Sequence, residues 1–200
     1  FSNILLRNPV NHPIFVRLSG RNRAPEGNGP SQVRRVSFSN INVSGAPGPY
    51  ASGVVGLPGG IIEDVSFSDI HVRSAGGGSR EDAARDIEER PKSSLEPSFM
   101  GAFPAHGLWV RHARNVSVRD VSFSVDRPDA RPAIVLDDVQ GATIDGVRSS
   151  LAPRAAVRTA VANATGLTPA PSGLAFPPCG VDDLPRVLRP VDEGGQLHHA

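Results

Sequence analysis

The sequence is poor in aromatic and other hydrophobic residues, which build a thick core, and in cysteines, which could cross-link it by disulfides. Of its 200 residues, 38% are hydrophobic and 5% are aromatic, and cysteine, methionine, tryptophan and tyrosine each occur once. The single cysteine, Cys179, excludes an internal disulfide framework and any metal site built from several cysteines. No apolar run approaches the roughly 20 residues that a membrane-spanning helix needs, so no membrane span is expected.

A surplus of charge of one sign is also lacking. The chain has 21 basic and 20 acidic residues, which gives a formal net charge of +1. This balance gives no reason to expect nucleic acid or an anionic membrane surface as a partner. Lys92 is the only lysine; arginine suits two-pronged carboxylate binding, but codon usage explains a skew that runs through the whole chain equally well.

The chain is rich in glycine and proline, with 21 and 19 residues, and it carries a short repeated pattern. Each copy has an apolar residue, a spacer, then Asn, Asp or Gly, then another apolar residue. The copies begin at Phe1, Phe38, Phe67, Val118 and Ile144. Repeats at intervals of a few tens of residues are typical of solenoids.

The third position of the repeat indicates how the chain bends. It is occupied by residue types that tolerate the left-handed backbone region: Asn3, Asn40, Asp69, Asp120 and Gly146. The flanking apolar residues can both face inward only if the chain turns there, because side chains otherwise alternate along a strand. We therefore predict an all-β fold, a parallel β-helix forming a partial solenoid of about four to five coils with stacked phenylalanines inside. The alternative, an antiparallel sandwich, predicts neither the stacked column nor the repeated corner.

Departures from the shortest repeat spacing predict where loops are inserted. The coils occupy residues 1–150, with insertions at 19–35 and 74–106. Within the longer insertion, the Ser79–Asp82 segment has the spacing of a helix capping box. Residues 151–200 lose the pattern and are rich in proline, which predicts an irregular tail.

Residues 8–16, 55–65 and 95–112 carry a likeness to a known family. They resemble stretches of glycoside hydrolase family 28, the polygalacturonase-like, pectin-degrading right-handed parallel β-helices. The third stretch is the most specific, because so long a non-repeating loop is hard to match by chance. The resemblance covers about residues 1–150. It implies a right-handed helix that binds a pectin- or galacturonan-like polysaccharide, needs no cofactor or metal, and is secreted or periplasmic.

The resemblance also implies that the catalytic residues lie outside this chain. The family uses three aspartates, in an Asn-Thr-Asp motif and an Asp-Asp pair, followed by a Gly-His-Gly turn and an Arg-Ile-Lys clamp. None of these motifs is present in its family context, and inversion requires two well-placed carboxyl groups. We therefore assign no catalytic residue. We expect the carboxy-terminal part of such an inverting hydrolase, inactive alone, whose amino-terminal coils in the same chain supply the aspartates. The alternative is a non-catalytic module for polysaccharide binding or surface adhesion.

Five residues are candidates for substrate binding. Arg17, Arg21 and Arg23 follow a strand that neighbours the substrate groove in the family. They could pair with galacturonate carboxylates or be ordinary solvated charges of a loop. His106 and Trp109 could form a platform for a sugar ring. In the alternative, Trp109 points outward from its strand and is covered by the long loop.

The paired acidic residues are interpreted structurally rather than catalytically. Neighbouring parallel coils repeat about every 4.8 Å. Aligning two equal segments of successive coils therefore places Arg111 over Asp137 and His112 over Asp138. Such stacking explains the double aspartate without catalysis, as ion pairs worth about 0–1 kcal/mol when exposed. The Glu88–Glu89 pair is interpreted as the solvated face of the loop helix.

Overall fold

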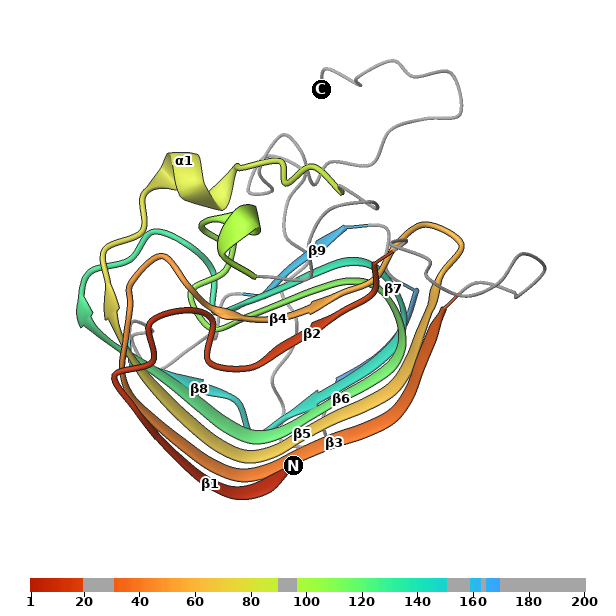
Figure 1. The fold of residues 1–200 in the computed structure, drawn as a ribbon, viewed down its shortest axis with the longest axis horizontal. Coiled ribbons are helices and arrows are strands. Elements are labelled where there is room, and N and C mark those ends of the chain that lie inside the picture. Colours follow the sequence, from red (N-terminus) through yellow and green to blue (C-terminus); the bar gives the residue numbers. More distant parts are fainter. Residues whose placement is uncertain (20–30, 90–96, 151–158, 163–164, 170–200) are drawn as a thin grey trace.

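The computed structural model describes residues 1–19, 31–89, 97–150, 159–162 and 165–169. Its described part is all-β, with one short helix and one 3-10 turn among strands that curl around a central core (Figure 1). The strands are β1 (Ser2–Arg7), β2 (Phe15–Arg17), β3 (Gln32–Ala46), β4 (Ser52–Val55), β5 (Ile61–Gly76), β6 (Leu108–Arg127), β7 (Ile134–Asp145), β8 (Arg148–Ser149), β9 (Thr159–Ala162) and β10 (Thr165–Pro169).

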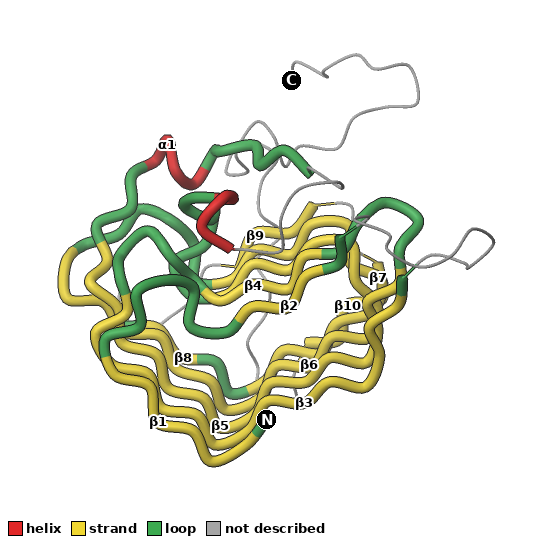
Figure 2. Tube along the Cα trace, viewed as in Figure 1, coloured by secondary structure: helices red, strands yellow, loops and turns green. Residues whose placement is uncertain are grey.

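All strand pairings in the described residues are parallel. One wall of the curled sheet runs through β1, β3, β5, β6 and β7, and the opposite wall runs through β2, β4, β6, β7 and β9. The long strands β6 and β7 bend from one wall to the other, so successive turns of chain lie directly above one another (Figure 2). The predicted all-β solenoid of parallel coils is confirmed, and the antiparallel sandwich is wrong. The right hand of the winding stays a prediction.

The repeated corner adopts the left-handed backbone that its residue types indicate. The φ angles are 57° at Asn3, 48° at Asn40, 52° at Asp69, 50° at Asp120 and 61° at Gly146. Each corner sits over the next in the strand register. The Asn40 side-chain amide donates a 2.7 Å hydrogen bond to the Asn3 side-chain oxygen. The corners therefore turn every coil at the same place.

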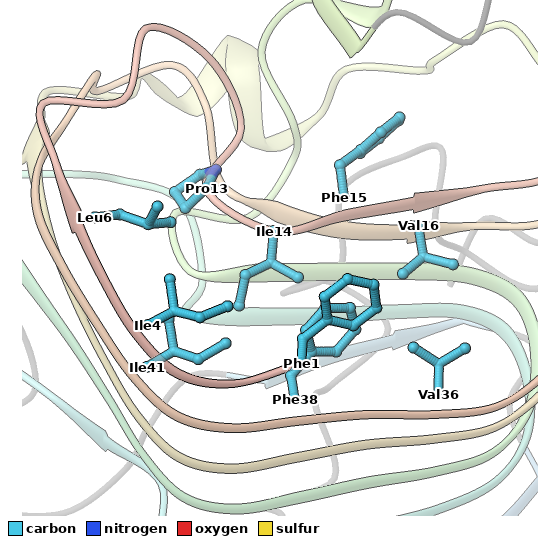
Figure 3. Close-up of a pocket in the computed structure, with 10 residues that line it drawn as sticks. All are labelled: Phe1, Ile4, Leu6, Pro13, Ile14, Phe15, Val16, Val36, Phe38 and Ile41. Carbon is cyan, nitrogen blue, oxygen red and sulfur yellow. The ribbon is translucent and has the colours of Figure 1, made fainter.

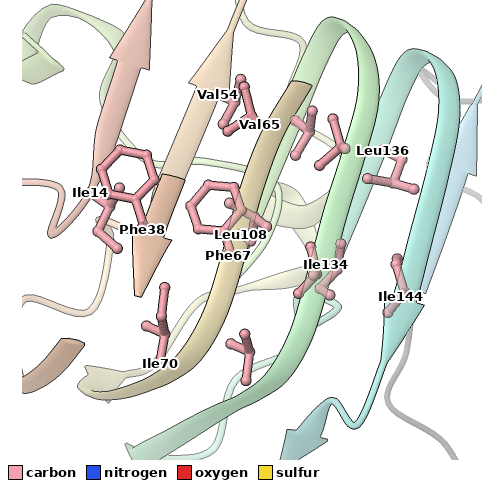
Figure 4. Packing of buried hydrophobic residues seen from close by; sticks show 14 of the residues in the cluster. Ile14, Phe38, Val54, Val65, Phe67, Ile70, Leu108, Ile134, Leu136 and Ile144 are labelled. Atoms are coloured by element: carbon pink, nitrogen blue, oxygen red, sulfur yellow. The ribbon is translucent and has the colours of Figure 1, made fainter. Parts of the chain in front are cut away.

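Aromatic and aliphatic residues stack in columns inside the coils. The ring centroids of Phe1 and Phe38 lie 5.1 Å apart and those of Phe38 and Phe67 lie 5.3 Å apart, with nearly parallel rings. Val118 and then Ile144 continue the column in the strand register. Phe38, Phe67, Val118 and Ile144 belong to one buried cluster that fills the interior (Figure 4), and Phe1 stacks on its end. The predicted inner column is confirmed.

The column ends in an apolar hollow beside β1. Its volume is about 390 Å³, and its lining includes Phe1, Ile4 and Ile14 (Figure 3). Phe1 is 73% exposed and Leu5 is 61% exposed. The amino-terminal face of the solenoid is thus open and apolar.

The long insertion forms a cover over the opposite wall. It begins with α1 (Arg80–Ala83), where Ser79 and Asp82 form the predicted capping box, and it includes the 3-10 turn η1 (Pro97–Met100). Its buried residues pack on outward-facing strand residues in a second apolar cluster, made of Ala51, Val55, Ile87, Met100, Phe103, Ala105, Trp109 and Val135. Neither helix in the described residues is long and apolar enough to cross a bilayer.

A single buried arginine joins this cover to the coils. Arg131 is 2% exposed and pairs with Asp129 at 2.7 Å. Its guanidinium also donates to the backbone carbonyls of Gly48, Pro49 and Phe103. Burial opposes ionisation of the Asp129 carboxyl. The hydrogen bonds from Arg131 and from the Gly78 backbone outweigh burial and lower its pKa. Three separate segments therefore depend on one side chain.

The structure departs from the sequence expectation after residue 150. The strands β9 and β10 lie in the segment predicted to be irregular, and both pair with β7. Thr165, Leu167 and Pro169 stand beside residues of β7 in the same parallel register as the earlier coils. The short alternation around Leu167 is enough for pairing, because the preceding coil offers a ready strand edge. The rest of the predicted tail lies outside the described residues.

Replacing Arg131 by methionine should destabilise the protein by about 3–5 kcal/mol, because Asp129 is left as an unpaired buried charge. Denaturant unfolding followed by the fluorescence of Trp109, the only tryptophan, measures the loss. The matched control is Arg80→Met on the exposed surface of α1, which should change stability by less than about 0.5 kcal/mol. Equal stabilities for the two variants would contradict the role assigned to Arg131.

Candidate functional site

The structure places the described candidates for substrate binding in different environments. Arg17 lies half-buried at the end of β2, and Arg21 and Arg23 lie outside the described residues. Trp109 is 2% exposed and His106 is 4% exposed. Trp109 points outward from its strand and is covered by the long loop, as the structural alternative predicted. A sugar could stack on Trp109 only if that loop moved, and His106 is buried elsewhere, so the substrate-binding role of the two residues stays a prediction.

The structure confirms the predicted stacking of charged residues between coils. Arg111 stands beside Asp137 in the strand register, with its Nε 3.0 Å from a carboxylate oxygen of Asp137. His112 Nδ1 lies 2.6 Å from a carboxylate oxygen of Asp138. His112 and Asp138 both have φ near 50°, which marks a further corner shared by the two coils. The register thus fixes two cation–carboxylate pairs side by side.

A third carboxylate, from the cover, completes this cluster. Glu89 Oε1 lies 2.7 Å from His112 Nε2 and 3.6 Å from Arg111 Nη2. Two residues before Glu89, the backbone carbonyl of Ile87 accepts a 2.7 Å hydrogen bond from Arg111 Nη1. The interpretation of Glu89 as part of a solvated helix face is therefore wrong, because α1 ends at Ala83 and the chain then turns back toward the coils.

The cluster is shielded from water on the side of the coils. The side chains of Arg111, His112 and Asp137 are 16%, 12% and 15% exposed, whereas Glu89 is 29% exposed. Burial raises the pKa of the Asp137 carboxyl above its ordinary value, although the charges of Arg111 and His112 act in the opposite direction. Both ring nitrogens of His112 face carboxylate oxygens, Nδ1 at 2.6 Å from Asp138 and Nε2 at 2.7 Å from Glu89. The cluster thus brings one guanidinium and one imidazole together with three carboxylates.

The surroundings of Arg111 extend the cluster along the sheet. Its guanidinium carbon lies 6.0 Å from the centre of the Trp109 ring, which is within reach of a cation–π contact. In the strand register Arg17 is followed by Val55 and then by Arg111. Parallel strands lie about 4.8 Å apart, so two arginines stand two strands apart on the same outward-facing column. Within the described part of the chain, no group of His, Cys, Asp or Glu is arranged to hold a metal ion.

Sequence reasoning found the two stacked pairs but missed Glu89. The pairs follow from a repeat, which aligns any two coils of equal length. The position of Glu89 depends on how a non-repeating loop folds back, and no spacing in the sequence encodes that. Its only signal was a pair of acidic residues, Glu88 and Glu89, next to the buried Ile87.

His106 belongs to a separate buried environment. Its Nδ1 has no hydrogen-bond partner in the described residues, and its Nε2 is 3.5 Å from the hydroxyl of Ser149. Burial lowers the pKa of His106 to about 4. The ring is therefore neutral in the folded protein at neutral pH, and it packs edge-on against Phe123.

Comparison with protein families contradicts the predicted function. The model of the catalytic domain of the oxidoreductase DRL matches residues 153–200. This match names an oxidoreductase and not a glycoside hydrolase, so the prediction of a polygalacturonase-like hydrolase is wrong. It covers less than half of the chain and lies almost entirely beyond the coils. It therefore does not assign the coils themselves to that family.

Comparison with solved structures gives a distant likeness. A crystal structure described as a "putative glycosyl hydrolase from Parabacteroides merdae ATCC 43184" is 11% identical and has a TM-score of 0.32. The likeness covers 70% of this chain and 69% of that chain. At this TM-score it carries no argument about fold or activity. No curated protein matches the sequence, and the resemblance to glycoside hydrolase family 28 is unconfirmed.

The neutral state of His106 gives the stability a specific pH dependence. In the unfolded chain the ring takes up a proton below its ordinary pKa of 6.5, whereas in the folded protein it does so only near pH 4. The contribution of the neutral His106 ring to the free energy of unfolding is therefore complete above pH 6.5 and is lost as the pH falls from 6.5 to 4. The maximal slope is about 1.4 kcal/mol per pH unit.

Denaturant unfolding of the wild type and of His106→Gln at a series of pH values measures this contribution. The variant should show a shallower loss of stability between pH 6.5 and pH 4. The control His71→Gln removes a histidine whose side chain is 44% exposed, and it should keep the wild-type slope. Parallel curves for wild type and His106→Gln would show that His106 is not the titrating group.

Proposed function

We propose that the chain is part of a carbohydrate-active oxidoreductase. In this proposal the coils hold an anionic polysaccharide, and the segment from residue 153 belongs to the catalytic part. The match of residues 153–200 to an oxidoreductase catalytic domain supports the proposed oxidoreductase activity, called here the enzymatic half of the proposal. The Glu89 oxygen that faces both Arg111 and His112 supports the proposed binding of an anionic polysaccharide, called here the binding half.

The binding half follows from the donors that the coils present. Arg111 and His112 are each held on one side by an aspartate of the next coil. His112 Nε2 and Arg111 Nη2 both face one oxygen of Glu89, at 2.7 Å and 3.6 Å, while Arg111 Nη1 donates to the Ile87 carbonyl. Arginine and histidine side chains placed in this way favour a carboxylate ligand. We infer that the ligand is a uronate-containing polysaccharide such as a pectin- or galacturonan-like polymer.

A polymer fits this face better than a small acid does. Arg17 and Arg111 stand two strands apart in one outward-facing column, about 10 Å at the usual strand spacing. Val55, which lies between the two arginines, is buried under the long insertion, so a polymer would reach both arginines only when that cover is displaced. A polymer of this kind lies outside the cell membrane, so we propose a secreted or periplasmic location. We also propose that the coils wind right-handed, as about 98% of parallel crossover connections do.

Titration calorimetry with polygalacturonate tests the binding half. The wild type should bind the charged polymer, and binding should weaken as salt is raised because exposed charges are screened. Arg111→Gln should weaken binding about tenfold or more, since one charge-assisted contact is lost. Arg119→Gln, on the exposed outer face of β6, is the matched control and should bind like the wild type. Equal binding of fully methyl-esterified, neutral galacturonan would contradict recognition of carboxylates.

A redox assay tests the enzymatic half. The purified full chain, mixed with polygalacturonate and either oxidised nicotinamide dinucleotide or a dye acceptor, should reduce the acceptor. The reaction is followed by the absorbance of the acceptor. The control is the same protein after heat denaturation. A reduction rate equal to that control with every acceptor would contradict the oxidoreductase assignment and leave the binding result untouched.

A further inference from the structure

We infer that Glu89 competes with the polysaccharide for one binding site. Its carboxylate occupies the position between Arg111 and His112, called here the seat, that a uronate carboxylate would occupy. The inference rests on the proposed function, because it concerns access to the same site. The proposal makes the segment around Glu89 an autoinhibitory element. The polysaccharide binds fully only when this segment leaves.

The residues around the seat come from two kinds of structure, the strands of the coils and the loop that carries Glu89. Arg111 and His112 lie on β6, and the aspartates that hold them from behind, Asp137 and Asp138, lie on the neighbouring strand β7. Both strands belong to the central stack of coils. Glu89 instead belongs to the long insertion, outside any helix or strand. Arg111 and His112 therefore keep their aspartate contacts when Glu89 leaves, whereas Arg111 loses its hydrogen bond to the Ile87 carbonyl if the whole segment moves.

The contacts of Glu89 are those that a ligand carboxylate would make. Its Oε1 is 2.7 Å from His112 Nε2 and 3.6 Å from Arg111 Nη2. The Arg111 Nε is buried and lies 3.0 Å from an Asp137 oxygen, so Nη2 is the arginine donor that faces Glu89. A uronate carboxylate entering from solvent would meet the same two donors. Exchanging one carboxylate for another leaves the ionic contacts of both cations unchanged.

Two contacts of Ile87 hold the segment beside Glu89. Its backbone carbonyl accepts a hydrogen bond from Arg111 Nη1, and its side chain is buried. Opening this element costs at least these two contacts. A polymer with several carboxylates can offset that cost, whereas a single uronate replaces only the Glu89 contact.

The same arrangement explains a selectivity for acidic sugars. A neutral sugar that displaced Glu89 would leave two partly buried cations facing a hydroxyl group. Removing one partner of a buried charged contact is strongly unfavourable. With Glu89 in place the site is therefore closed to neutral polymers and open only to ligands that bring their own carboxylate.

The test compares Glu89→Gln with Glu88→Gln, which makes the same change in net charge one residue away on an exposed side chain. Binding of oligogalacturonate is measured by titration calorimetry, and the mobility of the segment by amide hydrogen exchange of residues 80–89. The apparent affinity of a site that is open only part of the time is reduced by the open fraction. Glu89→Gln should therefore bind about tenfold more tightly than the wild type, with faster exchange at residues 86–89. Glu88→Gln should match the wild type in both measurements.

The outcomes separate this inference from the proposed function. Oligogalacturonate binding that is equal in the wild type and Glu89→Gln overturns the competitor role and leaves polysaccharide binding intact. Weaker binding by Glu89→Gln overturns it as well, because Glu89 would then assist the ligand. If no protein binds oligogalacturonate while Glu89→Gln still shows faster exchange, the proposed function is wrong and the competitor role falls with it.

Discussion

The left-handed corner is the constraint on which the rest of this structure depends. A strand can change direction without moving its apolar residues outward only if one residue takes a backbone conformation that most side chains resist. Here that residue is Asn, Asp or Gly at five equivalent places, and each is stacked on the next. Gly146 shows how tight the stack is, because a Cβ at this position would lie 2.6 Å from the Asp120 carboxylate. Coils that turn at the same place share one register.

The register in turn determines which side chains meet. It stacks the phenylalanine rings inside the coils, where the apolar area removed from water stabilises the fold by about 25 cal/mol per Å². Outside the coils it places Arg111 beside Asp137 and His112 beside Asp138. Those two pairs would be unremarkable surface contacts if the long insertion did not cover them. The Arg111–Asp137 pair and His112 are largely shielded from water, and the cover adds Glu89. A structural repeat and a loop together therefore make the candidate site.

The parts of the molecule that follow from periodicity could be predicted from the sequence. The inner column, the corners, the capping box at Ser79 and the Arg111–Asp137 pair all depend on spacings of fixed length, and all are present. The parts that depend on a loop returning to the coils could not be predicted. Arg131 is such a case: it contacts carbonyls of residues 48, 49 and 103, and no pattern in the chain relates these positions.

The error about function has the same physical origin. The stretches that resembled a hydrolase family lie in the coils and their covering loop, and the coil features in particular are what stacking demands of a parallel solenoid. A likeness built on them supports the fold, which the structure bears out at the level of parallel coils. It does not support a reaction, because function resides in sites carried by a fold and not in the fold itself. The hydrolase motifs were absent from the sequence, and the family model that matches residues 153–200 is that of an oxidoreductase catalytic domain. The two observations that bear on chemistry therefore come from different parts of the chain: the Arg111–His112–Glu89 cluster lies where the covering loop meets the coils, and the match to an oxidoreductase catalytic domain covers residues 153–200.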